Sequence, residues 1–98
     1  MSELYFKRGY SYFATKNNEK AKPDFYEIKD VDNKYAHPAN YYYSHIAYQE
    51  KNYETALTGF TRLLNSETFS TVVPYYITQI YFIQGKYTDV VRNAPAFN

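Results

Sequence analysis

Apolar residues recur three or four positions apart through most of this chain, the spacing that places them on one face of an α-helix. Two aromatic-rich stretches show it clearly, one from Leu4 to Phe13 and another from Ile77 to Tyr81. The pattern predicts an all-α protein. The predicted helices span about residues 3–16, 19–34, 38–50, 53–65, 71–84 and 87–94.

Proline and turn-forming residues fall at the boundaries that this pattern sets. Pro38 and Pro74 stand where the third and fifth helices would begin, and Pro23 likewise fits only the first turn of the second. A helix accepts proline there because the N–H groups of its first turn have no partner within the helix. The turns between paired helices contain residues that cap a helix or accept a left-handed backbone, namely Asn17 or Asn18, Asn52 and Gly85.

A repeat of about 35 residues underlies the pattern. Three segments align without gaps: KNNEKAKPDF from Lys16, KNYETALTGF from Lys51 and GKYTDVVRNA from Gly85. The step from one segment to the next is the length of two helices and two turns. The small apolar position of the segments holds Ala21, Ala56 and Val90, and the position four further along holds Phe25, Phe60 and Ala94.

In these segments, and in the helices before them, the chain resembles the tetratricopeptide repeat family. The resemblance implies one domain, residues 1–98, in which about three helical hairpins form a right-handed superhelical stack. The hairpins would occupy about residues 3–35, 38–69 and 71–98, with the last one incomplete. The family's usual tryptophan near the start of a repeat and its closing proline are both missing here.

The resemblance also implies which residues pack the hairpins. A small residue in each first helix lets the second helix approach closely, and Gly9 and Ser44 match it, with Thr78 a looser match. The family has a large residue three positions after the small one, and Ala47, three positions after Ser44, departs from this pattern. The expected packing residues are Gly9, Tyr12, Ala21, Phe25, Ser44, Tyr53, Ala56, Phe60, Gly85, Tyr87 and Val90.

In the family, the first helices line a concave groove that binds a peptide or protein segment. The matching positions here are mostly aromatic, and tyrosine and phenylalanine give a large contact area at a small rotamer cost. The expected function is therefore a non-catalytic protein-interaction scaffold; the alternative assigns some of these rings to packing between repeats or to self-assembly. The groove positions are Phe6, Tyr10, Phe13, Tyr41, His45, Tyr48, Tyr75, Gln79 and Phe82.

The third hairpin is incomplete, since few residues follow Tyr87 before Pro95. A repeat stack without a polar capping helix exposes the face meant for the next repeat. We therefore expect either a fragment of a longer repeat protein or a homodimer formed through this uncapped C-terminal repeat. The residues expected on the exposed face are Phe82, Ile83, Val90 and Val91.

The composition and charge of the chain disfavour some classes of binding partner. The 98 residues include 14 Tyr and 7 Phe, and the formal net charge is only +1. That charge supplies little attraction for phosphate backbones or anionic lipid, so neither nucleic acid nor membrane insertion is expected. Binding of single-stranded RNA, as by pentatricopeptide repeats, is a disfavoured alternative because the groove positions include no lysine or arginine.

The sequence fits more than one cellular compartment. The chain has no cysteine, which fits the cytosol and the periplasm equally, and its N-terminus does not resemble a signal peptide. In its abundance of tyrosine, the sequence resembles repeat proteins of bacterial envelopes. This slightly favours a periplasmic or envelope location if a longer parent carries a signal peptide.

No arrangement of side chains predicts catalysis, a cofactor or a metal site. His37 and His45 are too far apart to share a metal on one helical turn, and no cysteine joins them. Ser44 and His45 are adjacent, so their side chains point about 100° apart on a helix and cannot act as nucleophile and base. We therefore expect no enzyme activity and no cofactor.

Overall fold

Five α-helices account for the part of the chain that the computed structural model describes, residues 2–31 and 34–85. Within those residues there is no strand, so the predicted all-α fold is confirmed for them. The predicted helix 87–94, and with it Tyr87 and Val90, lies outside the described residues. The helices are α1 (Ser2–Ala14), α2 (Asn18–Ile28), α3 (Ala36–Gln49), α4 (Tyr53–Arg62) and α5 (Val73–Ile83).

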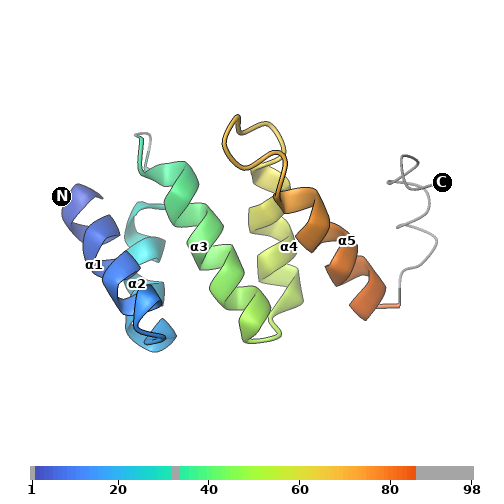
Figure 1. Ribbon diagram of the computed structural model, residues 1–98, viewed down its shortest axis with the longest axis horizontal. Helices are drawn as coiled ribbons and strands as arrows, with labels where there is room; N and C mark the ends of the chain where they lie inside the picture. Colours follow the sequence, from blue (N-terminus) through green and yellow to red (C-terminus); the bar gives the residue numbers. More distant parts are fainter. Residues whose placement is uncertain (1, 32–33, 86–98) are drawn as a thin grey trace.

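The helices follow one another in an open row (Figure 1). α1, α3 and α5 lie on the near side of the view, with α2 and α4 behind them. Each helix packs mainly on the helices before and after it in sequence, and the packing is most extensive within the hairpins α1–α2 and α3–α4. The architecture is repeat-like, with overall extents of 44 × 25 × 18 Å.

The turns that follow α1, α3 and α5 each contain one residue with a left-handed backbone conformation. Lys16 and Lys51 have φ of 63° and 65°, and Gly85 has φ of 77°. The next amides, of Asn17 and Asn52, donate to carbonyls five positions earlier, at N···O distances of 2.7 and 2.8 Å. Asn17 and Asn52 are the N-cap residues of α2 and α4, as predicted. The left-handed residues before them are lysines, which carry a steric penalty that glycine avoids.

α2 differs from the predicted helix. The side chain of Asn17 accepts a hydrogen bond from the Lys20 amide at 3.3 Å, so the helix begins directly after it. Pro23 therefore lies inside α2, and its prediction in the first turn was wrong. The helix ends at Ile28, well before the predicted end, because Ile28 is its last buried residue and Asp30 beyond it is exposed.

The core consists of two clusters of buried apolar residues, one at each junction between hairpins. α3 contributes to both, since Ala39 and Ile46 belong to the cluster with α2, and Ala47 to the cluster with α4 and α5. Each hairpin thus protects the next, as in repeat architectures. The first cluster is Ala21, Phe25, Ile28, Ala39 and Ile46; the second is Ala47, Ala56, Phe60, Leu63, Val73 and Ile80.

Candidate binding surface

Small residues bring the two helices of each hairpin together. Gly9 of α1 is buried, and a Cβ added there would lie 3.0 Å from the Phe25 ring and 3.1 Å from Cβ of Asp24. In the second hairpin the glycine is on the other helix: Gly59 of α4 faces Ser44 of α3, and a Cβ at Gly59 would lie 3.0 Å from Cβ of Ser44. Both predicted small residues therefore lie where the helices touch.

The other predicted packing residues divide between core and surface. Tyr12 and Tyr53 are partly buried against the first and second clusters. Ala47, which departs from the family pattern, is completely buried, whereas Gly85 is exposed in its turn. Five of the predicted packing residues are fully inaccessible to solvent, namely Ala21, Phe25, Ser44, Ala56 and Phe60.

A tyrosine fills the junction between the first and second hairpins. Tyr42 of α3 stacks on Phe25 of α2, with ring centroids 5.5 Å apart and planes at 21°. This ring joins the two hairpins through contacts with both helices of the first. Four further rings surround it at centroid distances from 5.0 to 6.2 Å, those of Phe6, Tyr10, Phe13 and Tyr41.

Tyr76 of α5 repeats this arrangement at the second junction. It stacks on Phe60 of α4, with centroids 5.0 Å apart and planes at 13°. Each ring around Tyr76 stands one repeat after a ring around Tyr42, so the junctions follow the same period as the turns. The four further rings lie at 5.4 to 6.4 Å and belong to Tyr41, His45, Tyr48 and Tyr75.

The segments before α3 and α5 add one ring each. Tyr35 lies 5.5 Å from Phe6, and Phe69 stacks on Tyr41 with centroids 4.7 Å apart and planes at 16°. Phe69 stands one repeat after Tyr35, the same relation that joins the residues at the two junctions. Rings from α1, α3 and α5 therefore form one continuous set.

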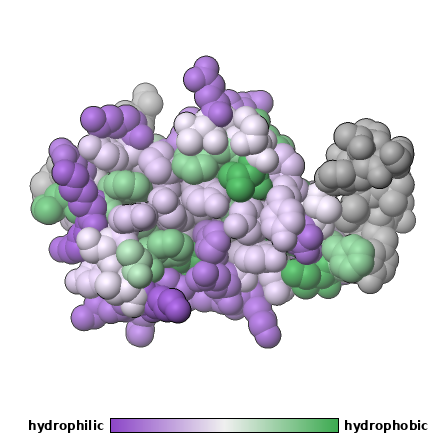
Figure 2. Space-filling view, in the orientation of Figure 1, coloured by the Kyte–Doolittle hydropathy of each residue, from purple (hydrophilic) through white to green (hydrophobic). Residues whose placement is uncertain are grey.

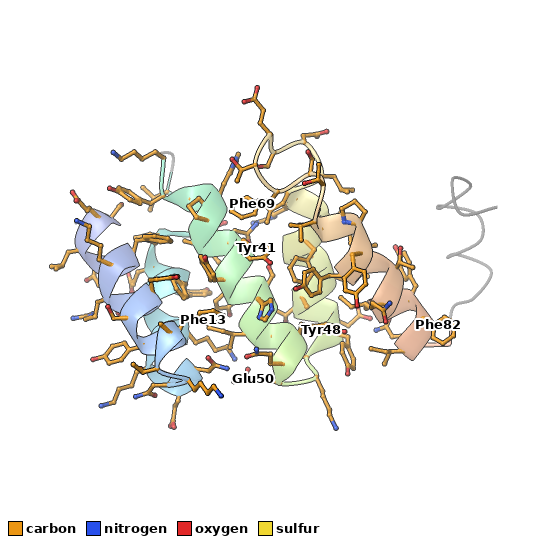
Figure 3. All side chains as sticks on the ribbon, viewed as in Figure 1. Phe13, Tyr41, Tyr48, Glu50, Phe69 and Phe82 are labelled. Carbon is orange, nitrogen blue, oxygen red and sulfur yellow. The ribbon has the colours of Figure 1, made fainter. Side chains whose placement is uncertain are left out.

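We call the nine predicted groove residues the aromatic band. Tyr10, Tyr75 and Phe82 are 47%, 61% and 58% exposed, whereas the other six members are partly buried. In Figure 3, Phe13 lies between α1 and α3, and Phe82 points outward from α5. Much of the predicted groove thus also packs the hairpins, and its use by a ligand stays a prediction.

Burial shifts the pKa of two titratable groups of the band further toward the neutral form. Together with a hydrogen bond to Tyr76, it raises the pKa of Tyr41 to about 12. Burial also lowers the pKa of His45 below its ordinary value of 6.5. The His45 ring lies 5.7 Å from Phe13 and 5.5 Å from Tyr76. The centre of the band is therefore neutral at physiological pH.

Charged side chains lie around the band. Figure 2 shows the face of α1, α3 and α5 mainly in pale colours with some green, and with stronger purple along its left, upper and lower edges. The ion pairs that join different helices all use α2 or the segment after it. They are Arg8 with Asp24, Lys22 with Glu50 and Arg62 with Asp30, at N···O distances of 2.6, 2.8 and 2.9 Å.

A small cavity of about 180 Å³ lies where α2, α3 and α4 meet. Ser44, Lys29 and Arg62 are among its lining residues. Both cations are already within 2.9 Å of Asp30 oxygens. An anion that entered this cavity would have to compete with that carboxylate, so the cavity does not form a ready anion site.

Residues 2–31 and 34–85 offer neither a metal site nor a membrane span. Within these ranges no group of three or more His, Cys, Asp or Glu side chains is placed to hold a metal ion. None of the helices there has the length and apolar character to cross a bilayer. The aromatic band is therefore the candidate binding surface.

Sequence reasoning missed the residues at the centre of each junction. These residues are Tyr42 and Tyr76, and the repeat relates them because Tyr76 stands one repeat after Tyr42. Tyr42 is one of three consecutive tyrosines, and the sequence does not say which of them faces the preceding hairpin. Gly59 was missed because the family pattern places the small residue on the first helix, and Phe69 because it lies between helices.

Comparison with known proteins assigns no family. No family model, curated protein or solved structure matches the chain. Function is therefore argued from the geometry of the described residues.

Proposed function

We propose that this chain is a non-catalytic protein-interaction scaffold of the tetratricopeptide repeat kind, which binds a protein or peptide segment on its aromatic band. The observation that carries the proposal is the exposure of Tyr10, Tyr75 and Phe82, each about half open to solvent on the face built by α1, α3 and α5. Large rings at the surface favour burial against a partner, and tyrosine is enriched where protein interfaces are best packed.

The repeat period supports the family part of the proposal. The left-handed turn residues Lys16, Lys51 and Gly85 recur once per repeat, and so do the junction tyrosines Tyr42 and Tyr76. A stack of three hairpins at about 3–35, 38–69 and 71–98 explains both recurrences at once. A right-handed superhelix with an open face is the form that such a stack would take.

The electrostatics favour a partner of low charge. His45 and Tyr41 are uncharged at neutral pH, and burial among rings moves the pKa of each further toward the neutral form. A nucleic acid would need lysine or arginine beside the stacking rings to neutralise its backbone, and the band contains neither. An apolar or aromatic protein segment is the better match.

Site-specific photo-crosslinking tests the proposal. A photoreactive phenylalanine analogue replaces Tyr10 or Tyr75 on the band, or Tyr26 of α2 as a control that is 59% exposed. We expect both band positions to capture the same protein from the native cell and the Tyr26 position not to capture it. The captured protein is then purified and its affinity measured with the unlabelled chain.

A Tyr10→Ala, Tyr75→Ala double variant should weaken that affinity at least about tenfold, the size of effect that interface hot spots show, while far-ultraviolet circular dichroism stays unchanged. Equal capture at Tyr26, or unchanged affinity of the double variant, would contradict the proposal.

A further inference from the structure

Six tyrosines on α1, α3, α4 and α5 form a continuous path of ring contacts through both junctions. Tyr53 contacts Tyr48, with ring centroids 5.9 Å apart, and Tyr48 contacts Tyr76 at 5.4 Å. From there the successive centroid distances are 6.4, 5.3 and 5.5 Å, which are typical of packed aromatic pairs. Tyr75, which contacts Tyr76, forms a branch. We call the six residues the tyrosine path, and in order they are Tyr53, Tyr48, Tyr76, Tyr41, Tyr42 and Tyr10.

Tyrosine is the most easily oxidised type of side chain in the part of the chain that the structure describes. The sequence has no cysteine and no tryptophan, and its one methionine is residue 1. Phenylalanine rings pack around the path, but they lack the hydroxyl group that lets a phenol lose an electron and a proton and become a neutral radical. An electron vacancy on one tyrosine therefore moves most readily to another tyrosine in contact with it.

We propose that the tyrosine path transfers one-electron oxidising equivalents from Tyr53 to the surface at Tyr10. The oxidant is an oxygen-centred radical, which takes a hydrogen atom from the Tyr53 hydroxyl group and leaves a phenoxyl radical there. This activity is separate from the proposed binding function. It uses the same packed rings that join the hairpins.

Each step along the path moves one electron and one proton, so no net charge is left on an inner ring. A ring that gives an electron to its oxidised neighbour also loses its hydroxyl proton, and the neighbour regains one. Tyr41 and Tyr76 share a hydrogen bond along which this proton can shift. At the end of the path, the Tyr10 radical takes an electron and a proton from a soluble enediol such as ascorbate. The net reaction oxidises the enediol and reduces the oxygen-centred radical to its hydroxyl form.

Exposure gives the path its end point. Tyr10 is 47% exposed, whereas the other five members are partly buried. Burial also raises the pKa of Tyr41, Tyr42 and Tyr48, which moves these phenols further toward the protonated form. An inner ring that lost an electron but kept its proton would be a partly buried cation, which is unfavourable. Electron and proton therefore leave an inner ring together, and a soluble reductant reaches the radical most readily at Tyr10.

A tethered photo-oxidant tests the proposal on the full 98-residue chain. The exposed Lys51 lies two residues before Tyr53, and Lys51→Cys gives a variant with a single cysteine for attaching a ruthenium polypyridyl sensitiser. Light and a cobalt(III) ammine quencher produce ruthenium(III), which takes an electron from Tyr53 while the phenolic proton passes to water. A nitroso spin trap then marks the radicals, and peptide mass spectrometry locates them. We expect trap adducts on Tyr10.

Variants that remove one hydroxyl group interrupt the path. Tyr42→Phe and Tyr76→Phe each keep an aromatic ring in place but take away the phenol that oxidation requires. Each should abolish the adduct on Tyr10, while the adduct on Tyr53 stays. If either variant fails to fold by circular dichroism, Tyr41→Phe interrupts the same stretch of the path.

Tyr43→Phe is the matched control. Tyr43 follows Tyr42 on α3 but lies off the path, in contact with Tyr26 at a centroid distance of 5.6 Å. Its substitution removes the same hydroxyl group from the same helix. The adduct on Tyr10 should therefore be unchanged in this variant.

Three results would overturn the inference. They are the absence of an adduct on Tyr10, an unchanged Tyr10 adduct in both Tyr42→Phe and Tyr76→Phe, and equal adducts on Tyr10 and Tyr26. Tyr26 is 59% exposed outside the path, so equal adducts there would indicate oxidation from solution. None of these results depends on capture of a partner protein, so the proposed function is tested separately.

Discussion

The first and second hairpins bring their helices into close contact with different side chains. In the first, Gly9 makes room on α1, and the facing Asp24 is buried and accepts two hydrogen bonds from Arg8, at 2.6 and 2.9 Å. In the second, Gly59 occupies the place equivalent to Asp24, and Ser44 faces it. The repeat therefore keeps a glycine at the contact between the helices, while either helix can supply it.

The two junctions between hairpins differ from each other less than the two hairpins do. Tyr42 and Tyr76 each stack on a phenylalanine and contact four further rings, and the chemical differences lie among those rings. Where Tyr10 contacts Tyr42, His45 contacts Tyr76. The second junction thus contains an imidazole ring where the first has a phenol.

The largest effect is expected from removing a junction tyrosine. Tyr42→Ala and Tyr76→Ala should each lower the free energy of unfolding by about 2–4 kcal/mol, below the upper range for fully buried aromatic residues because both rings are partly exposed. Urea denaturation followed by circular dichroism measures this. Tyr26→Ala is the control, since Tyr26 is 59% exposed. If the Tyr42→Ala and Tyr76→Ala variants lose no more stability than Tyr26→Ala, these tyrosines do not stabilise the junctions.

Exchanging the small residue in the second hairpin should have the next largest effect. Gly59→Ala places a Cβ against Ser44, and we expect a loss of about 1–2 kcal/mol, since overpacking exceeds the gain in helix propensity. Adding Ser44→Gly transfers the glycine to the first helix, as in the first hairpin, and should recover at least half of that loss. A double-mutant cycle measures the coupling, and purely additive single-variant effects would rule out the contact.

A smaller effect, of opposite sign, is expected at the turns. Lys16→Gly and Lys51→Gly should each raise the free energy of unfolding by about 0.5–1 kcal/mol, because glycine adopts the left-handed conformation without the Cβ penalty. Lys20→Gly, inside α2, is the matched control and should lower stability. Thermal and urea unfolding would both register the difference. A loss of stability in the turn variants would show that these φ angles do not control the turns.

The smallest effect concerns pH at the second junction. Burial lowers the pKa of His45 in the folded state, so below pH 6.5 the unfolded state takes up a proton that the folded state does not. Stability should therefore fall as the pH decreases from 6.5 through the lower folded pKa. His45→Tyr copies the first junction and should flatten this part of the profile, whereas His37→Gln, outside the junction, should not. Melting temperatures measured from about pH 4.5 to about pH 7.5 would test it.

Much of the fold was predictable because it depends on local signals. Asn17 and Asn52 take the N-cap positions and Gly85 adopts a left-handed turn, as expected from residue type, and the side chain of Asn17 makes a capping hydrogen bond. The end of α2 was not predictable in this way. It depends on where burial stops, at Ile28, and that is decided by the packing of α2 on its neighbours.

The candidate surface was less predictable than the fold. Helical spacing places Phe6, Tyr10 and Phe13 on one side of α1, yet it does not show that these rings surround Tyr42. The repeat period alone also assigns Tyr41 and Tyr75 to equivalent positions. Their exposure differs because, within residues 34–85, a further helix packs against Tyr41 and none against Tyr75.

The sequence by itself determined the all-α character, the turns and the repeat period, because these follow from residue type and from spacing along one chain. Tertiary structure decided which tyrosine of three enters a junction, which helix supplies the close-packed glycine, and which rings stay open to solvent. These properties depend on the side chains that a neighbouring hairpin brings near, and such neighbours are separated by about a full repeat in the sequence.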